Sequence, residues 1–263
     1  MAGAIHWETR SAIGLLTLVH PGKLNAMSVA MWRSLREVAE DIDRQRGLRG
    51  VIVRGAEGQF CAGGDIAEYP DFRFSVEGLR QFHEEVVWPA LSALLRCEVP
   101  LIAQIEGACM GAGVEIASCC DLRVAGEGAR FGAPIARLGF SMAPREAALV
   151  ARAVGEMTAR EMLLEAAVLD AQVMERRGFL HQVVPDAEVA AQAAARAERM
   201  AALAPEAARR TKRLFFELFG PDAGVKRSGV AMENIVSTAY DYADSAEHRE
   251  GIAAFLAKRR PNF

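Results

Sequence analysis

The stretch GACMGAGVEIASCC, residues 107–120, sets three glycines among alanines, cysteines and a methionine, and it carries a single acid, Glu115. The apolar run PLIAQIEG (100–107) precedes it and DLRVAGE (121–127) follows it, and both have the composition of buried strands. The sequence therefore predicts a strand, a glycine turn, a helix and a second strand. In such a unit the N-terminus of the helix points at a ligand.

Glycine-rich turns often bind phosphate, but this turn lacks the residues for it. A P-loop requires Lys and then Ser or Thr after its last glycine, whereas Val114 follows Gly113. The dinucleotide fingerprint G-x-G-x-x-G also fails, because Gly111-x-Gly113 is followed by Val-Glu-Ile and lacks the third glycine. An acid in the first turn would also repel a pyrophosphate. Two explanations for Glu115 remain open. It is either a first-turn acid stabilised by the helix dipole or a desolvated carboxylic acid that transfers a proton.

The rest of the first half alternates between strands and helices. Residues 12–19 and 50–55 read as strands, 28–45 as a helix capped by Ser28, and 75–96 as a long amphipathic helix. From about residue 144 the chain becomes mainly helical. We expect an α/β core over residues 1–200 and a C-terminal helical region over residues 201–263.

Composition narrows the class of protein. The chain has 263 residues, of which 51% are hydrophobic, and a net charge of -3, which gives no basic surface for nucleic acid. The five cysteines lack Cys-x-x-Cys spacing, so we expect buried free thiols and no metal site. The N-terminus lacks a signal-peptide pattern and no apolar run reaches the roughly 20 residues of a membrane span. These features predict a cytoplasmic protein that does not bind membranes.

A second glycine turn, FCAGGDI (60–66), also follows a strand and a loop. Its ordinary explanation is a tight turn capped by Asp65. Together, however, two such turns could direct two backbone N–H groups at one oxygen atom, as in an oxyanion hole.

These two motifs, with PGKLNAM (21–27), RFGAP (130–134), RGFLHQVVP (177–185) and the ending EGIAAFLAKRRPNF (250–263), resemble the enoyl-CoA hydratase/isomerase family, the crotonase superfamily. The resemblance runs in order along essentially the whole chain. It implies an α/β fold of repeated ββα units and a C-terminal region that mediates homotrimers or dimers of trimers. It also implies acyl-CoA thioester substrates of fatty acid metabolism and no cofactor, because coenzyme A is part of the substrate.

The resemblance also implies the roles of particular residues. The N–H groups of Gly64 and Ala112 would bind the thioester oxygen, and Glu115 would act as the general acid and base. Contacts to coenzyme A would come from the same loops, with these substrate-binding candidates: Lys23, Ala62, Gly64, Asp65, Ile66, Ala67, Ala112 and Ile135.

One position departs from the family pattern. Hydratases carry a second glutamate after the proline of a segment like F-G-x-P-E, and Ile135 occupies that position here. Isoleucine cannot transfer a proton. Arg137, Arg145 and Glu146 are polar residues nearby that the sequence does not place relative to the pocket. His83, on the helix after the site loop, is a weaker candidate, and otherwise it is a helix-surface residue.

The sequence thus predicts a lyase that would be named an enoyl-CoA hydratase. Because of Ile135, double-bond isomerisation or another reaction using one glutamate remains an alternative, as does an acyl-CoA binder without catalytic activity. RNA binding has no basic groove to support it.

Overall fold

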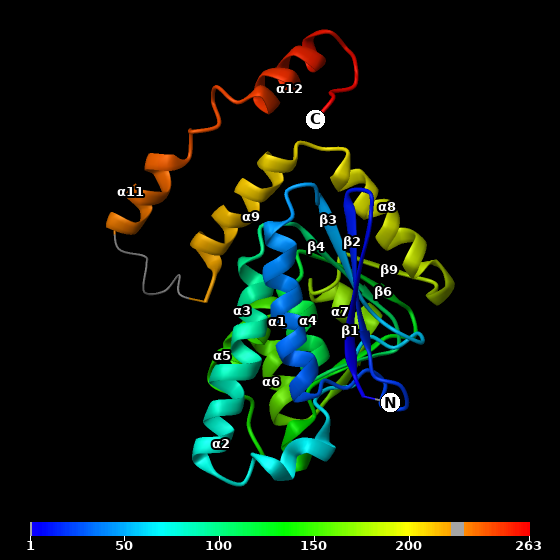
Figure 1. Ribbon diagram of the computed structural model, residues 1–263. Helices are drawn as coiled ribbons and strands as arrows, with labels where there is room; N and C mark the ends of the chain where they lie inside the picture. The colour runs from blue at the N-terminus through cyan, green and yellow to red at the C-terminus, as the bar shows by residue number, and fades with distance from the viewer. Residues whose placement is uncertain (1, 222–228) are drawn as a thin grey trace.

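The computed structural model describes residues 2–221 and 229–263 and is built around a six-stranded sheet (Figure 1). Its order is β1-β2-β3-β4-β6-β9, with β1 antiparallel to β2 and the other pairs parallel. The strands are β1 (Ala4–Arg10), β2 (Ile13–Val19), β3 (Gly50–Gly55), β4 (Leu101–Ile105), β6 (Leu122–Gly126) and β9 (Gln182–Val184). The four strands predicted before residue 128 are therefore confirmed.

Helix α1 (Val29–Arg44) forms the first crossover between parallel strands. The Ser28 side chain accepts a hydrogen bond from the backbone N–H of Met31, which confirms the predicted N-cap. The helix buries a stripe that includes Trp32 and Leu35 in the main core.

The long helix predicted at 75–96 is helical throughout but is not a single α-helix. It consists of α2 (Val76–Gln81), a π-helical segment η2 (Phe82–Val87) and α3 (Trp88–Arg96). In the π segment the N–H of Trp88 donates to the carbonyl oxygen of His83, five residues back. Single π turns inside α-helices occur frequently at functional sites.

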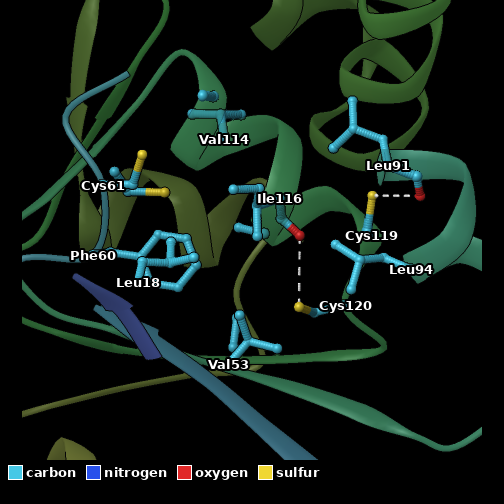
Figure 2. Close-up of a cluster of buried hydrophobic side chains, with 14 of the residues drawn as sticks. Leu18, Val53, Phe60, Cys61, Leu91, Leu94, Val114, Ile116, Cys119 and Cys120 are labelled. Atoms are coloured by element: carbon cyan, nitrogen blue, oxygen red, sulfur yellow. Dashed lines mark hydrogen bonds between the residues drawn. The ribbon is translucent and has the colours of Figure 1, made fainter. Parts of the chain in front are cut away.

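A second sheet has three short strands in the order β5-β7-β8: β5 (Ala108–Met110), β7 (Arg130–Gly132) and β8 (Val168–Asp170). Residues 107–120 lie between β4 and β6 and form helix α4 (Ala112–Cys119), which confirms the predicted strand, helix and second strand. The short strand β5 lies within the expected glycine turn and was not predicted. Every residue of α4 is buried. Figure 2 shows Val114 and Ile116 of this helix among side chains from the main sheet and α3. Small residues let this central helix pack closely on all sides.

The five cysteines are free and buried, as predicted. The thiols of Cys119 and Cys120 donate hydrogen bonds to the carbonyl oxygens of Leu91 and Ile116, respectively (Figure 2). Burial raises the pKa of the Cys120 thiol to about 12, and that of Cys61 likewise to about 12. These thiols therefore behave as small apolar side chains.

The remaining helices up to residue 201 complete the core. They are η1 (Ile66–Asp71), η3 (Ile135–Leu138), α5 (Pro144–Val154), α6 (Glu156–Leu164), α7 (Ala171–Arg176), η4 (Asp186–Glu188) and α8 (Val189–Ala201). Ala193 and Ala197 of α8 pack on Leu15, Ile52 and Ile102, in a cluster separate from the main core. Helices thus cover both faces of the main sheet, as parallel sheets require.

The C-terminal region contains α9 (Pro205–Phe219), α11 (Gly229–Thr238) and α12 (Ala246–Leu256), and residues 222–228 of the expected helical region lie outside the described residues. Helix α9 is anchored to the core by Lys212, whose ammonium group lies 2.8 Å from Asp121 and donates to the carbonyl oxygen of Val99. In Figure 1, α11 and α12 extend beyond the body of the protein. Within the described ranges, no helix combines the length and apolarity that a bilayer crossing requires.

The C-terminal helices expose many large apolar side chains. Those at least one-third exposed are Leu214, Phe215, Phe219, Met232, Val236, Tyr240, Tyr242, Ile252, Phe255 and Leu256. A cavity of about 580 Å³ lies between α9 and the helices that follow it. Large exposed apolar patches are uncommon on soluble monomers.

Candidate active site

The two glycine turns lie side by side because their backbones pair. Cys61 and Cys109 form a parallel bridge, in which the N–H of Cys61 donates to the oxygen of Ala108 and the N–H of Met110 donates to the oxygen of Cys61, each at 2.8 Å. Only glycine fits at position 113, since a Cβ there would lie 2.6 Å from the Cys61 oxygen. The sequence spacing of glycines thus reflects a close backbone approach.

Positive φ angles at two glycines direct the following N–H groups. Gly63 has φ +116° and Gly111 has φ +47°, which side chains rarely adopt. Within residues 2–221 and 229–263, the N–H groups of Gly64 and Ala112 have no hydrogen-bond acceptor. Both residues line one cavity. Two free donors on one cavity wall are suited to bind a carbonyl oxygen.

This cavity has a volume of about 190 Å³. Six of the predicted site residues line it: Ala62, Gly64, Ile66, Ala112, Glu115 and Ile135. The other three, Lys23, Asp65 and Ala67, are not among its lining residues. The Lys23 ammonium group lies 2.5 Å from the Asp65 carboxylate, which also accepts a hydrogen bond from the N–H of Ala67 and caps η1. The ordinary explanation of Asp65 as a cap therefore holds in this structure, and contacts of these three residues with coenzyme A stay a prediction.

Glu115 lies in the first turn of α4 and is 9% exposed. Its carboxyl group has no hydrogen-bond partner among the residues that the structure describes. Burial is the main cause that raises the pKa of Glu115 to about 8, and the nearby charge of Glu146 raises it further, whereas Arg73 opposes the shift. A carboxylic acid with such a pKa can both hold and release a proton near neutral pH.

Two residues that the sequence left unplaced form a pair beside this acid. The Nδ1 of His83 lies 3.0 Å from Oε1 of Glu146, whose side chain is 1% exposed. His83 also lines the cavity, so it is not simply a helix-surface residue. A neighbouring ion pair between Glu84 of η2 and Arg145 of α5, 3.0 Å apart, joins the two elements that carry His83 and Glu146. Arg137 is exposed and instead donates to the carbonyl oxygen of Ala166.

A further part of the wall is aromatic and cationic. The Arg73 guanidinium lies over the rings of Tyr69 and Phe140, 4.3 and 3.7 Å from their centroids. The Tyr69 hydroxyl occupies the space beside Gly64, where a Cβ would come within 2.3 Å of it. No local sequence pattern marked Tyr69 or Arg73, because they reach the cavity through the irregular segment around η1.

Among the described residues no three His, Cys, Asp or Glu side chains gather as a metal site would require. The cavity wall instead combines two backbone donors, a buried acid and a histidine that is paired with the Glu146 carboxyl group behind it. These are the features of a site for acid–base chemistry on a bound carbonyl compound.

Comparison with known proteins identifies the class more closely. The sequence profile "Enoyl-CoA hydratase/isomerase" matches residues 8–263, and the chain belongs to this family. The 2,3-dehydroadipyl-CoA hydratase of Escherichia coli is 32% identical over 254 residues, covering 95% of this chain and 94% of that protein. The mevalonyl-coenzyme A hydratase of Aspergillus fumigatus is 30% identical over 254 residues, covering 95% of this chain and 90% of that protein.

A solved structure shows the same fold. The enoyl-CoA hydratase/carnithine racemase of Magnetospirillum magneticum matches with a TM-score of 0.91 at 35% identity, covering 100% of this chain and 96% of that one. The family, the crotonase-like α/β fold and the family-level function predicted from the motifs are therefore confirmed.

Proposed function

We propose that this protein is an enzyme that acts on an acyl-CoA thioester through a stabilised enolate. The thioester oxygen would accept hydrogen bonds from the N–H groups of Gly64 and Ala112, and Glu115 would transfer the proton at the neighbouring carbon. No cofactor takes part in this scheme, since coenzyme A is carried by the substrate.

One observation carries the proposal. A carboxylic acid with a pKa of about 8 lines the same small cavity as two N–H groups that find no acceptor in the described part of the chain. Negative charge that develops on the thioester oxygen would be stabilised by these donors and by the N-terminus of α4. The related hydratases named above act on CoA thioesters, which agrees with this substrate class.

The test is an assay of crotonyl-CoA and a panel of 3-enoyl-CoA thioesters with wild type and Glu115→Gln. Turnover of any member should fall by about 10²–10⁴ in the variant, the usual contribution of a general acid or base. Glu127→Gln is the matched control, because Glu127 is exposed and its side chain has no hydrogen bond among the described residues. Crotonyl-CoA reports hydration, whereas 3-enoyl-CoA thioesters report isomerisation, which one glutamate could perform.

Two results would count against the proposal. Turnover that is unchanged in Glu115→Gln would remove Glu115 from the mechanism. Tight binding of acyl-CoA without turnover of any substrate would favour the alternative, a binder that has kept the fold and lost the chemistry.

The proposal includes a homotrimer or a dimer of trimers. Its support is the set of exposed apolar side chains on α9, α11 and α12 and in the turn after α11, which a neighbouring copy could cover. Light scattering coupled to size-exclusion chromatography measures the mass directly, and a monomer at micromolar concentration would contradict it.

A further inference from the structure

The half-buried His83 lines the cavity, and the buried Glu146 lies behind it. One carboxylate oxygen of Glu146 meets Nδ1 of His83, and the other oxygen, Oε2, is buried without a hydrogen-bond partner among the described residues. A buried carboxylate oxygen left unpaired is costly and is uncommon outside functional sites. The unpaired oxygen of Glu146 therefore indicates a functional role for the pair rather than a purely structural one.

The fold holds His83 in place from two sides. His83 belongs to the π-helical segment η2, and Glu146 belongs to the first turn of α5. The ion pair between Glu84 and Arg145, the residues next to them in sequence, joins the same two elements. The Phe82 ring packs edge-on against the imidazole, with 5.1 Å between centroids. The imidazole therefore has a fixed orientation at the cavity wall.

We propose that His83, oriented by Glu146, is the second proton-transfer group of this site and performs the task that Ile135 cannot. The inference rests on the proposed function, because it assigns a partner to Glu115 in the same cavity. His83 and Glu115 both line the cavity, and the charge of Glu146 acts on Glu115, so the three groups are close together.

The hydrogen bond at Nδ1 determines which nitrogen can react. A carboxylate only accepts, so in a neutral imidazole paired with the Glu146 carboxylate Nδ1–H is the donor and the lone pair lies on Nε2. The same arrangement orients histidine bases in hydrolases. Glu146 is thus a positioning residue, and His83 Nε2 is the atom that would accept a proton in the cavity.

Hydration of a 2-enoyl thioester then has a balanced assignment. Nε2 of His83 takes a proton from water as the water oxygen bonds to C3, and the C2–C3 π electrons move into the enolate held by Gly64 and Ala112. Glu115, which is protonated below its pKa of about 8, then gives its proton to C2. Exchange with solvent returns the proton to Glu115 and removes the one held by His83. No oxidant or further reactant is needed.

The pH dependence of this scheme involves every charged or titratable group near Glu115. The charged ones are Glu146 from α5 and Arg73 from the segment around η1. The neutral titratable ones are Tyr69 from that same segment, Cys61 from the glycine turn at 60–66 and Cys119 from α4 itself, and His83 from η2 lines the same cavity. Removal of the Glu146 charge lowers the pKa of Glu115. The loss of hydration at high pH, where Glu115 has no proton to give, should then begin at lower pH.

The experiment compares two reactions of one protein. Hydration of crotonyl-CoA needs both groups, whereas exchange of the C2 hydrogen of butyryl-CoA for deuterium at pH 9 needs only Glu115 and the N–H donors. We expect His83→Gln to lose hydration by about 10²–10⁴ and to lose far less of the exchange. We expect Glu146→Gln to lose less hydration and to shift the high-pH limb of the profile downward. His6→Gln, a change at an exposed histidine, is the control.

The outcomes separate this inference from the proposed function. Equal losses of hydration and exchange in His83→Gln, or a wild type that exchanges but hydrates no enoyl-CoA, would overturn the role of His83 and leave that of Glu115. A wild type without exchange would overturn both. If His83→Gln does not fold, Glu146→Gln carries the test, and equal losses of hydration and exchange in that variant overturn the inference.

Discussion

The strongest stability prediction concerns Glu115→Gln, which replaces a buried acid by its neutral isostere. Folding raises the pKa of Glu115 from 4.5 to about 8, chiefly through burial. Below pH 4.5 Glu115 is protonated in both the folded and the unfolded chain, so its titration does not change the free energy of unfolding. As the pH rises towards 8, only the folded state holds the proton, so wild type loses stability over this window.

The magnitude follows from the size of the shift. The pKa of Glu115 differs by about 3.5 between the folded and unfolded states, and each pKa unit corresponds to about 1.36 kcal/mol. The free energy of unfolding that wild type loses at high pH is therefore at most about 5 kcal/mol. Water that enters the cavity reduces this penalty. We therefore expect the free energy of unfolding of the variant, relative to that of wild type, to rise by at least about 2 kcal/mol between pH 5 and pH 9.

Urea unfolding at pH 5, 7 and 9 and one protein concentration measures this gain. The variant should approach wild type at pH 5 and be clearly more stable at pH 9, although it is the less active protein. The control Glu127→Gln should follow wild type at every pH. A stability difference between Glu115→Gln and wild type that does not change with pH would refute the reasoning.

Four further predictions test the site and the assembly. Ala112→Pro removes one N–H donor at the first position of α4, where proline is tolerated. We expect kcat to fall by about 10²–10³ with little change in Tm, and an unchanged kcat would exclude this donor from catalysis. Gly64→Ala should lower activity because the new Cβ meets the Tyr69 hydroxyl, and Tyr69→Phe in the same chain should recover part of the loss; additive losses would contradict this contact. In the His83→Gln background, Ile135→Glu should restore hydration of crotonyl-CoA at least about tenfold, and no recovery would mean that position 135 cannot supply the missing proton transfer. Phe255→Glu, at a side chain 81% exposed on α12, should lower the mass seen by light scattering, whereas an unchanged mass would place the interface elsewhere.

Much of the fold could be predicted because its signals are local. The apolar runs of β2, β3 and β4, the capped helix after Ser28 and the glycine turns each lie within one short window of sequence. The strands of the smaller sheet have three residues each, too few for a periodic pattern, and they were not predicted.

The site was only partly predictable for a different reason. Gly64, Ala112 and Glu115 lie in motifs that are recognisable by themselves. Glu146 lies 31 positions after Glu115 in a polar-looking stretch, and only tertiary packing buries it against His83. The regular 3.6-residue period predicted for the helix at 75–96 places His83 on the helix surface. The π turn changes this period, so the side chain lies at the cavity instead.

The π turn also bears on how this site could change in evolution. A π turn takes up one more residue than an α turn, so the loss of a single codon among residues 84–86 would restore a regular helix. The buried face of α3 could keep its packing on α1 while everything before the deletion rotates by about 100°. His83 would then leave the cavity without any substitution at a cavity residue. Relatives aligned to this chain with a one-residue gap at this point would differ in proton chemistry while their glycine turns and acid stay the same.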